Sequence, residues 1–151
     1  MRVLILASLM LAACGGSSPL SPSDPSELRL TASISRAVLE PGDIATLTYR
    51  LENAGSDTVT IQFPSACQIK PYIERPPGTV VYPGGGEWGC AQVLTSLTLA
   101  PGGSKVEELR VRGGLSEMSS AFGLPSGDYA AYARIDGSST LQSAKVAFTV
   151  K

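Results

Sequence analysis

Residues 47–65 read LTYRLENAGSDTVTIQFPS, and this stretch decides the fold class. Apolar and polar residues alternate in two runs, Leu47–Leu51 and Val59–Phe63. A period of two is typical of a β-strand with one buried face and one solvated face. Between the runs, Asn53–Asp57 is composed of residues that favour turns. The stretch therefore predicts two strands separated by a turn.

The same pattern extends to both sides of this stretch. Alternation is found in Leu28–Ser35 before it and in Ala144–Lys151 at the carboxyl end. Turn signals separate the apolar runs at Pro41–Asp43, Pro101–Gly103, Pro125–Asp128 and Asp136–Ser138. From Leu28 onward we expect an all-β domain, an immunoglobulin-like β-sandwich of about seven to nine short antiparallel strands.

Two finer patterns concern individual strands. Leu124–Tyr129 is similar to a tyrosine corner, in which the tyrosine hydroxyl bonds to the backbone upstream. We therefore expect Tyr129 to be structural. Val106–Val111 breaks strict alternation by one residue, which predicts a β-bulge near Glu107 or Glu108.

The amino-terminal residues are typical of an exported lipoprotein. Residues 1–13 contain Arg2 and an apolar run that is too short for a transmembrane helix, which needs about 20 residues. Leu-Ala-Ala-Cys at residues 11–14 resembles the lipobox of bacterial lipoproteins. The resemblance implies that residues 1–13 are a signal peptide that is removed, and that lipidation of Cys14 anchors the chain. The alternatives are a plain secretory signal followed by a free cysteine, or a buried start of the fold.

Residues 14–27 form a linker of mainly Gly, Ser, Pro and acidic residues that cannot bury a core. The linker would hold the domain, residues 28–151, away from a membrane surface. Gly15 is not Asp, which by resemblance to Gram-negative lipoproteins favours the outer membrane over the inner membrane. We therefore expect an exported protein, anchored in the cell envelope through the lipid at Cys14.

Two cysteines, Cys67 and Cys90, remain after Cys14 is assigned. An exported protein enters an oxidising compartment, where an even pair of cysteines is expected to form a disulfide. The loop between them is rich in Pro and Gly, and Tyr72–Ile73 with Thr79–Tyr82 predicts a short hairpin inside it. A zinc or redox role is the alternative, but the chain offers neither histidine nor a Cys-x-x-Cys motif for it.

Composition argues against most catalytic chemistry. The 151 residues include no histidine, the usual general base near neutral pH and the commonest transition-metal ligand. No nucleophile or phosphate-binding motif is present, and the acidic residues are too dispersed for calcium. The net charge is −1 without a basic stripe, which gives nucleic-acid binding no support. We therefore expect a protein that is not an enzyme, with no catalytic, metal or cofactor-binding residues.

Four motifs follow one another along the domain: Leu47–Ser65, the aromatic Trp88, Leu-x-Pro-Gly at Leu99–Gly102 and Leu-Pro-x-Gly-x-Tyr at Leu124–Tyr129. In this order they resemble the BsuPI-type intracellular proteinase inhibitors, over roughly residues 30 to 150. The resemblance implies an immunoglobulin-like sandwich and, for the founding members, inhibition of serine proteases. This chain departs from the family in its export signal and its cysteine pair, and it matches no reactive-site motif.

The resemblance leaves two non-enzymatic functions open. The first is a lipoprotein that binds a protein, with a serine protease as one candidate target; a loop containing Arg75 or Tyr82 would enter the protease cleft. The second is a structural or accessory module of an envelope assembly. Trp88 is a further contact candidate, for a protein or a polysaccharide, because aromatic residues on a stapled loop suit interfaces. We favour the competing interpretation, in which Trp88 packs over the disulfide or under the loop.

Overall fold

The computed structural model of the chain describes residues 27–115 and 120–151. The expected signal peptide (residues 1–13), Cys14 and nearly all of the linker lie outside the described residues and stay predictions. Within the described ranges, no helix is long and apolar enough to cross a membrane.

The described residues form twelve strands and one short 3-10 turn. In chain order they are β1 (Leu28–Ile34), β2 (Val38–Leu39), β3 (Ile44–Asn53), β4 (Val59–Phe63), β5 (Lys70–Arg75), β6 (Thr79–Tyr82), η2 (Gly84–Gly86), β7 (Thr95–Leu99), β8 (Ser104–Gly113), β9 (Phe122–Leu124), β10 (Gly127–Asp136), β11 (Thr140–Gln142) and β12 (Val146–Val150). The two runs quoted first are β3 and β4, as predicted.

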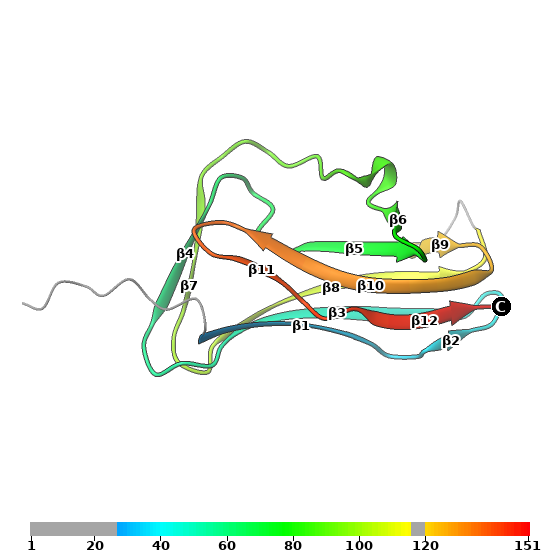
Figure 1. The fold of residues 1–151 in the computed structure, drawn as a ribbon, viewed down its shortest axis with the longest axis horizontal. Coiled ribbons are helices and arrows are strands. Elements are labelled where there is room, and N and C mark those ends of the chain that lie inside the picture. The colour runs from blue at the N-terminus through cyan, green and yellow to red at the C-terminus, as the bar shows by residue number, and fades with distance from the viewer. Residues whose placement is uncertain (1–26, 116–119) are drawn as a thin grey trace, which may run out of the picture.

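The strands build a two-layered sandwich with a strand pair across one end (Figure 1). One layer has the order β1-β3-β8-β9, and the other has the order β2-β12-β10-β5-β6, with β11 paired to β10. Strands β4 and β7 pair with each other and run across the direction of the rest (Figure 1). The all-β, immunoglobulin-like sandwich expected from the sequence is confirmed.

Strand number and direction differ in detail from the expectation. The number is higher than seven to nine because β2, β9 and β11 have only two or three residues, too few to show alternation in sequence. Two of the ladders, β12–β2 and β8–β9, are parallel rather than antiparallel. Each of them adds one of these very short strands to the edge of a layer.

The core lies between the two layers. Many of its buried side chains come from β3 and β8 on one side and from β5, β10 and β12 on the other: Leu47, Tyr49, Leu51, Val111, Ile73, Ala131, Ala133, Ile135, Phe148 and Val150. Each large apolar side chain that is fully buried stabilises the fold by about 1.5–3 kcal/mol relative to exposure. The alternation that predicted the strands is therefore the alternation between this core and solvent.

The prediction of a β-bulge near Glu107 or Glu108 is wrong. Strand β8 pairs with β3 in one continuous register from Ser104 to Arg112. The inner face of β8 begins with polar side chains, because Lys105 and Glu107 form an ion pair of 3.4 Å that is only partly covered. An ion pair on inner positions at the start of β8 makes the alternation in the sequence look shifted, although the strand is regular.

The tyrosine corner is confirmed. The hydroxyl of Tyr129 donates a hydrogen bond of 2.7 Å to the carbonyl of Pro125, and the tyrosine is 2% exposed. The predicted hairpin inside the cysteine loop is also present as β5 and β6, which pair antiparallel.

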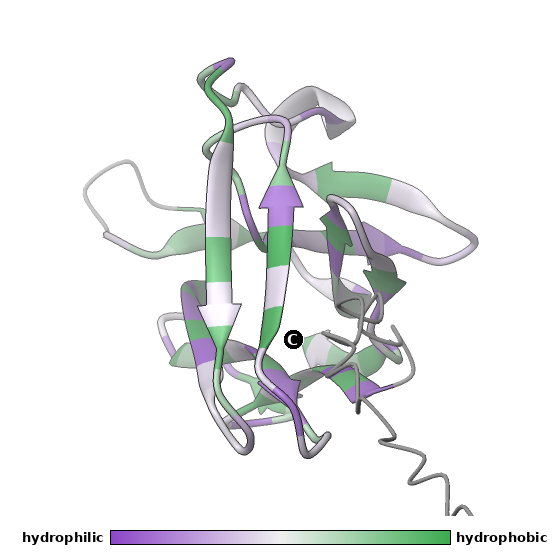
Figure 2. Cartoon of the chain, turned by 90° about the vertical axis from the view of Figure 1, so that its left-hand side faces the viewer, coloured by the Kyte–Doolittle hydropathy of each residue, from purple (hydrophilic) through white to green (hydrophobic). Residues whose placement is uncertain are grey.

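The β4–β7 pair is attached to the layer that contains β10, through the turn that follows β10. The amide of Ser138 donates to the carbonyl of Gln62 at 2.8 Å, and the amide of Gln62 donates to the Ser138 hydroxyl at 3.1 Å. Gly137 lies so close that a Cβ there would come within 2.4 Å of the Gln62 carbonyl oxygen. Figure 2 looks onto this end and shows hydrophobic and hydrophilic residues alternating along both strands of the pair.

Candidate functional site

The predicted disulfide is present between Cys67 and Cys90, whose Cα atoms are 5.7 Å apart. Cys67 lies in the loop that follows β4, and Cys90 lies in the irregular segment that precedes β7. The bond therefore fastens the irregular segment before β7 to the loop at the end of β4. This is the part of the domain that the sequence left least defined.

The segment Ala91–Thr95, which leads into β7, is held at both ends by the same loop. At one end, the amide of Ala66 donates a hydrogen bond of 3.0 Å to the carbonyl of Ala91, next to the disulfide. At the other end, the hydroxyl of Thr95 donates a bond of 2.9 Å to the carbonyl of Ser65. The Gln68 amide group also donates to the Thr95 hydroxyl, at 3.3 Å. We call Ala91–Thr95 the clamped segment.

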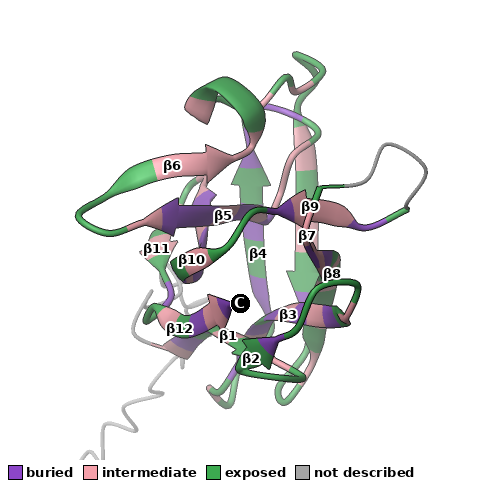
Figure 3. Cartoon of the chain, turned by 90° about the vertical axis from the view of Figure 1, so that its right-hand side faces the viewer, coloured by how far each residue is buried: buried purple, intermediate pink, exposed green. Residues whose placement is uncertain are grey.

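Between its two attachments the clamped segment presents apolar side chains to solvent. Val93 is 51% exposed and Leu94 is 82% exposed. Figure 3 shows the exposed loop that stands above β7 at the outer end of the molecule. Single exposed apolar residues are common, but Val93 and Leu94 are adjacent and lie on a backbone that is held at both ends.

The exposure of Val93 and Leu94 is not predicted by the sequence. Two adjacent apolar residues before an alternating run give the same signal as the first residues of a buried strand. The one hint is their position, four residues or fewer after Cys90 in a stretch without alternation.

The two aromatic candidates, Tyr82 and Trp88, are packed against each other. Their ring centroids are 5.6 Å apart with the planes nearly perpendicular, and Tyr82 meets Phe122 of β9 in the same way at 4.9 Å. The indole N–H of Trp88 donates to the carbonyl of Pro71 at 3.2 Å. Burial raises the pKa of the Tyr82 hydroxyl above its ordinary value. Both side chains are thus half-buried parts of a small aromatic cluster, and their rings already contact other side chains of the domain.

The third candidate, Arg75, is also engaged inside the domain. Its guanidinium donates to the Tyr129 hydroxyl at 2.7 and 3.1 Å and to the carbonyl of Ser126 at 3.1 Å. The guanidinium carbon lies 5.1 Å from the centre of the Tyr129 ring. An arginine fixed in this way stabilises the tyrosine corner and is not free to reach far into a partner.

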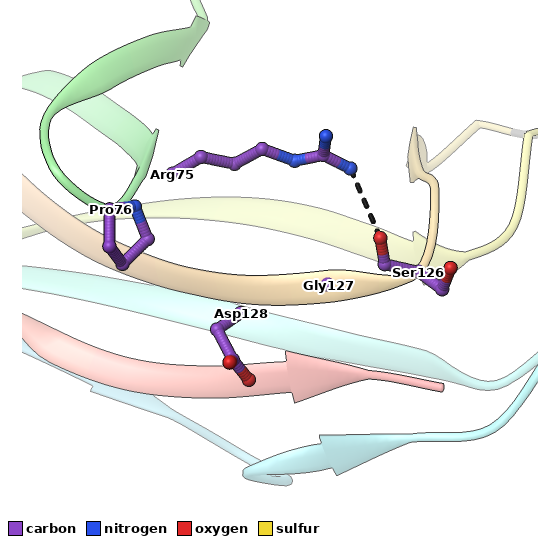
Figure 4. Close-up of a pocket in the computed structure, with 5 residues that line it drawn as sticks. All are labelled: Arg75, Pro76, Ser126, Gly127 and Asp128. Atoms are coloured by element: carbon purple, nitrogen blue, oxygen red, sulfur yellow. Dashed lines mark hydrogen bonds between the residues drawn. The ribbon is translucent and has the colours of Figure 1, made fainter.

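A shallow pocket of about 260 Å³ lies beside this arginine, and its lining is Arg75, Pro76, Ser126, Gly127 and Asp128 (Figure 4). The polar atoms in it include one cation and one carboxylate, with the arginine already bonded to Ser126. In the described residues there is no group of three or more side chains that could hold a metal ion. The pocket offers a polar surface rather than a set of groups arranged for a reaction.

One ion pair on the layer that contains β5 and β10 has a buried carboxylate and a half-exposed lysine. Glu74 is 8% exposed, and Lys145 donates to its carboxylate while lying 5.3 Å from the centre of the Tyr132 ring. Burial, reinforced by the charge of Glu74, raises the pKa of the Tyr132 hydroxyl. Pairing explains why the carboxylate can be buried, so this cluster is structural.

Comparison with known proteins gives one family and several distant structures. Residues 32–140 match the family model described as BsuPI, intracellular proteinase inhibitor. No curated protein sequence matches significantly. The sporulation control protein Spo0M from Bacillus subtilis is 10% identical with a TM-score of 0.48, over 83% of this chain and 49% of that chain.

Two further solved structures are similar at the same low level. The CARDB domain of the PF1109 protein from Pyrococcus furiosus is 15% identical with a TM-score of 0.45, over 82% of this chain and 89% of that chain. A β-glucosidase from Erythrobacter marinus is 12% identical with a TM-score of 0.44, and the match covers 81% of this chain but spans only 15% of the enzyme. The family match covers most of the chain, from the middle of β1 to the first residue of β11. The chain therefore belongs to the BsuPI family of intracellular proteinase inhibitors.

Proposed function

We propose that this protein is a non-enzymatic inhibitor of a serine protease, anchored to the membrane of the cell envelope. The observation that carries the proposal is the match to the inhibitor family over residues 32–140. An inhibitor of this kind acts by occupying the active-site cleft of the protease, so it needs no catalytic groups of its own. A sequence without histidine is compatible with such a role.

The location in the cell envelope is part of the proposal and rests on the sequence. The apolar run after Arg2 and the Leu-Ala-Ala-Cys motif ending at Cys14 support export and lipidation, and Gly15 supports the outer membrane. The disulfide between Cys67 and Cys90 supports the same conclusion, because such bonds persist in oxidising compartments. The protease that this chain meets is then an enzyme of the envelope, unlike the intracellular target that the family name describes.

The experiment is a titration of a panel of serine, cysteine and metalloproteases with the full-length chain, purified in mild detergent with its disulfide formed. We expect the activity of one or more serine proteases to fall in proportion to the added chain, while the other classes keep theirs. Full activity of every protease at a tenfold excess of the chain would refute the inhibitor proposal. It would favour the accessory-module alternative, which crosslinking in cells would then pursue.

A further inference from the structure

We propose that the clamped segment, Ala91–Thr95, is the part of the chain that enters the protease cleft, and that Leu94 fills an apolar specificity pocket there. This inference rests on the proposed function and goes beyond it, since it names the contact residue and the class of protease. The target is a serine protease that selects large apolar side chains.

Exposure singles out Leu94. At 82% it is the most exposed of the large hydrophobic side chains in the described residues, and the next, Leu115, is 78% exposed. Anchors of protein interfaces are side chains that lose contact with water on binding. A leucine that already projects from an anchored loop can enter a pocket while the sandwich stays unchanged. Within the segment, the turn closed by the Val93 amide on the Ala91 carbonyl, at 2.9 Å, has to open for the backbone to become extended.

The fixed ends of the segment explain how it can inhibit rather than be digested. Proteases bind the backbone of their substrates in extended form, as an added strand. The clamped segment lies between the disulfide at Cys90 and the first pair of the β4–β7 ladder, Phe63 and Thr95. Because both ends are fixed before binding, little conformational entropy is lost on association. The same fixation keeps the two sides of the segment together within the cleft, which disfavours release of a cleaved product.

The chemistry of the segment selects an apolar pocket. Residues 91–95 read Ala-Gln-Val-Leu-Thr and contain no charge. Val93 next to Leu94 adds a second exposed apolar side chain. A protease with a carboxylate at the base of its pocket, which selects Arg or Lys, would leave that carboxylate buried and unpaired against a leucine.

Arg75 and Tyr82, whose loops the sequence suggests for the protease cleft, are less suited to this role. The guanidinium of Arg75 is bonded to Tyr129 and Ser126, so it cannot extend into a cleft without breaking these hydrogen bonds. The ring of Tyr82 is held between Trp88 and Phe122. Neither side chain is free in the way that Leu94 is.

The test changes the specificity instead of only weakening binding. Leu94→Arg places a charge where an apolar side chain was, on a position that is almost fully exposed, so the fold is expected to remain intact. Leu115→Arg is the matched control, because Leu115 is exposed to a similar degree and lies outside the clamped segment. Inhibition constants are measured for the wild type and both variants against a chymotrypsin-like, a subtilisin-like and a trypsin-like protease. Circular dichroism in the near ultraviolet verifies that each variant is folded.

We expect the wild type and Leu115→Arg to inhibit an apolar-specific protease equally. Leu94→Arg should inhibit it at least about thirtyfold more weakly, the size of effect seen when an interface anchor is lost, and should gain inhibition of the trypsin-like protease. If the wild type inhibits and Leu94→Arg inhibits the same protease equally well, the inference is wrong while the proposed function stands. If the wild type inhibits no protease, the proposed function fails and the inference falls with it.

Discussion

At the scale of single residues, the hydroxyl of Tyr129 joins three segments of the chain. It donates to the carbonyl of Pro125 and accepts hydrogen bonds from the guanidinium of Arg75, while its ring stacks on Phe148 at 5.4 Å. One oxygen thus connects the end of β5 with the turn before β10. The pattern Leu-Pro-Ser-Gly-Asp-Tyr predicted the bond to Pro125, but not the arginine, which is 54 residues away in sequence.

Replacement Tyr129→Phe should destabilise the domain by about 1–3 kcal/mol, because it removes one neutral hydrogen bond and the acceptor of a charged donor. The measurement is the free energy of unfolding in urea. Tyr72→Phe is the control, since the Tyr72 hydroxyl makes no hydrogen bond within the described ranges and its ring stacks on Tyr132. Equal stability of the two variants would show that the corner adds nothing to the fold.

The hydroxyl of Tyr49 presents the opposite case. Tyr49 is completely buried, and within the described part of the chain its hydroxyl has no hydrogen-bond partner. Burial, with a smaller contribution from the charge of Tyr82, raises the pKa of Tyr49 far above its ordinary value. The folded state therefore holds Tyr49 neutral at a pH where the unfolded chain ionises it. A raised pKa contributes stability that is complete below the unfolded pKa of 10.0 and is lost as the pH rises above it.

Tyr49→Phe should leave stability at pH 7 unchanged or raise it by about 1 kcal/mol, because a buried unpaired hydroxyl is removed. The decline of stability above about pH 10 should also become shallower in this variant. Urea unfolding at pH 7 and at alkaline pH measures both effects. A variant that is markedly less stable at pH 7 would mean that the hydroxyl has a partner after all.

At the scale of elements, the strands that the sequence predicts are the ones with enough residues to alternate. Strands β3, β4 and β12 alternate between the core and solvent, and their periods are visible in the sequence. Strand β8 is misleading because the Lys105–Glu107 ion pair occupies inner positions. Local pattern also cannot tell Val93 and Leu94 from the start of a buried strand. Their exposure follows from where the disulfide and β7 hold the backbone, which only the assembled fold decides.

Removal of the disulfide by replacement of both Cys67 and Cys90 with Ala should lower the free energy of unfolding by about 3.4 kcal/mol. This is the chain-entropy value for a loop of this length, closed by residues 23 positions apart. Inhibition by this double variant should weaken as well, because the disulfide fixes the backbone next to the Ala66–Ala91 attachment of the clamped segment. Thermal unfolding and the protease titration measure the two effects in the same preparation. Unchanged values for both would contradict the role given to the bond.

At the scale of the whole molecule, we propose that a lipid anchor and a linker precede the sandwich. The sandwich could be predicted from the sequence because alternation and turn signals recur along the whole domain. The order of its strands could not, because it depends on pairings between distant residues such as β2 with β12. The anchor stays a prediction, which rests on Arg2, the apolar run and the motif ending at Cys14.

Cys14→Ala should leave the domain folded and release it from the membrane fraction, because the thiol is the proposed attachment point of the lipid. Fractionation of cells followed by immunoblotting measures the distribution. Cys67→Ala is the control, since that cysteine belongs to the disulfide and not to the proposed anchor. A Cys14→Ala variant recovered with the membranes as fully as the wild type would contradict the anchor.

We propose that the domain blocks a serine protease by forming a complex of one chain with one enzyme. The most direct measurement is the residual activity of an apolar-specific serine protease, at a concentration well above the inhibition constant, as the full-length chain is added. We expect a linear fall that reaches zero at one equivalent. Activity that stays unchanged at many equivalents, for every serine protease tried, would contradict it.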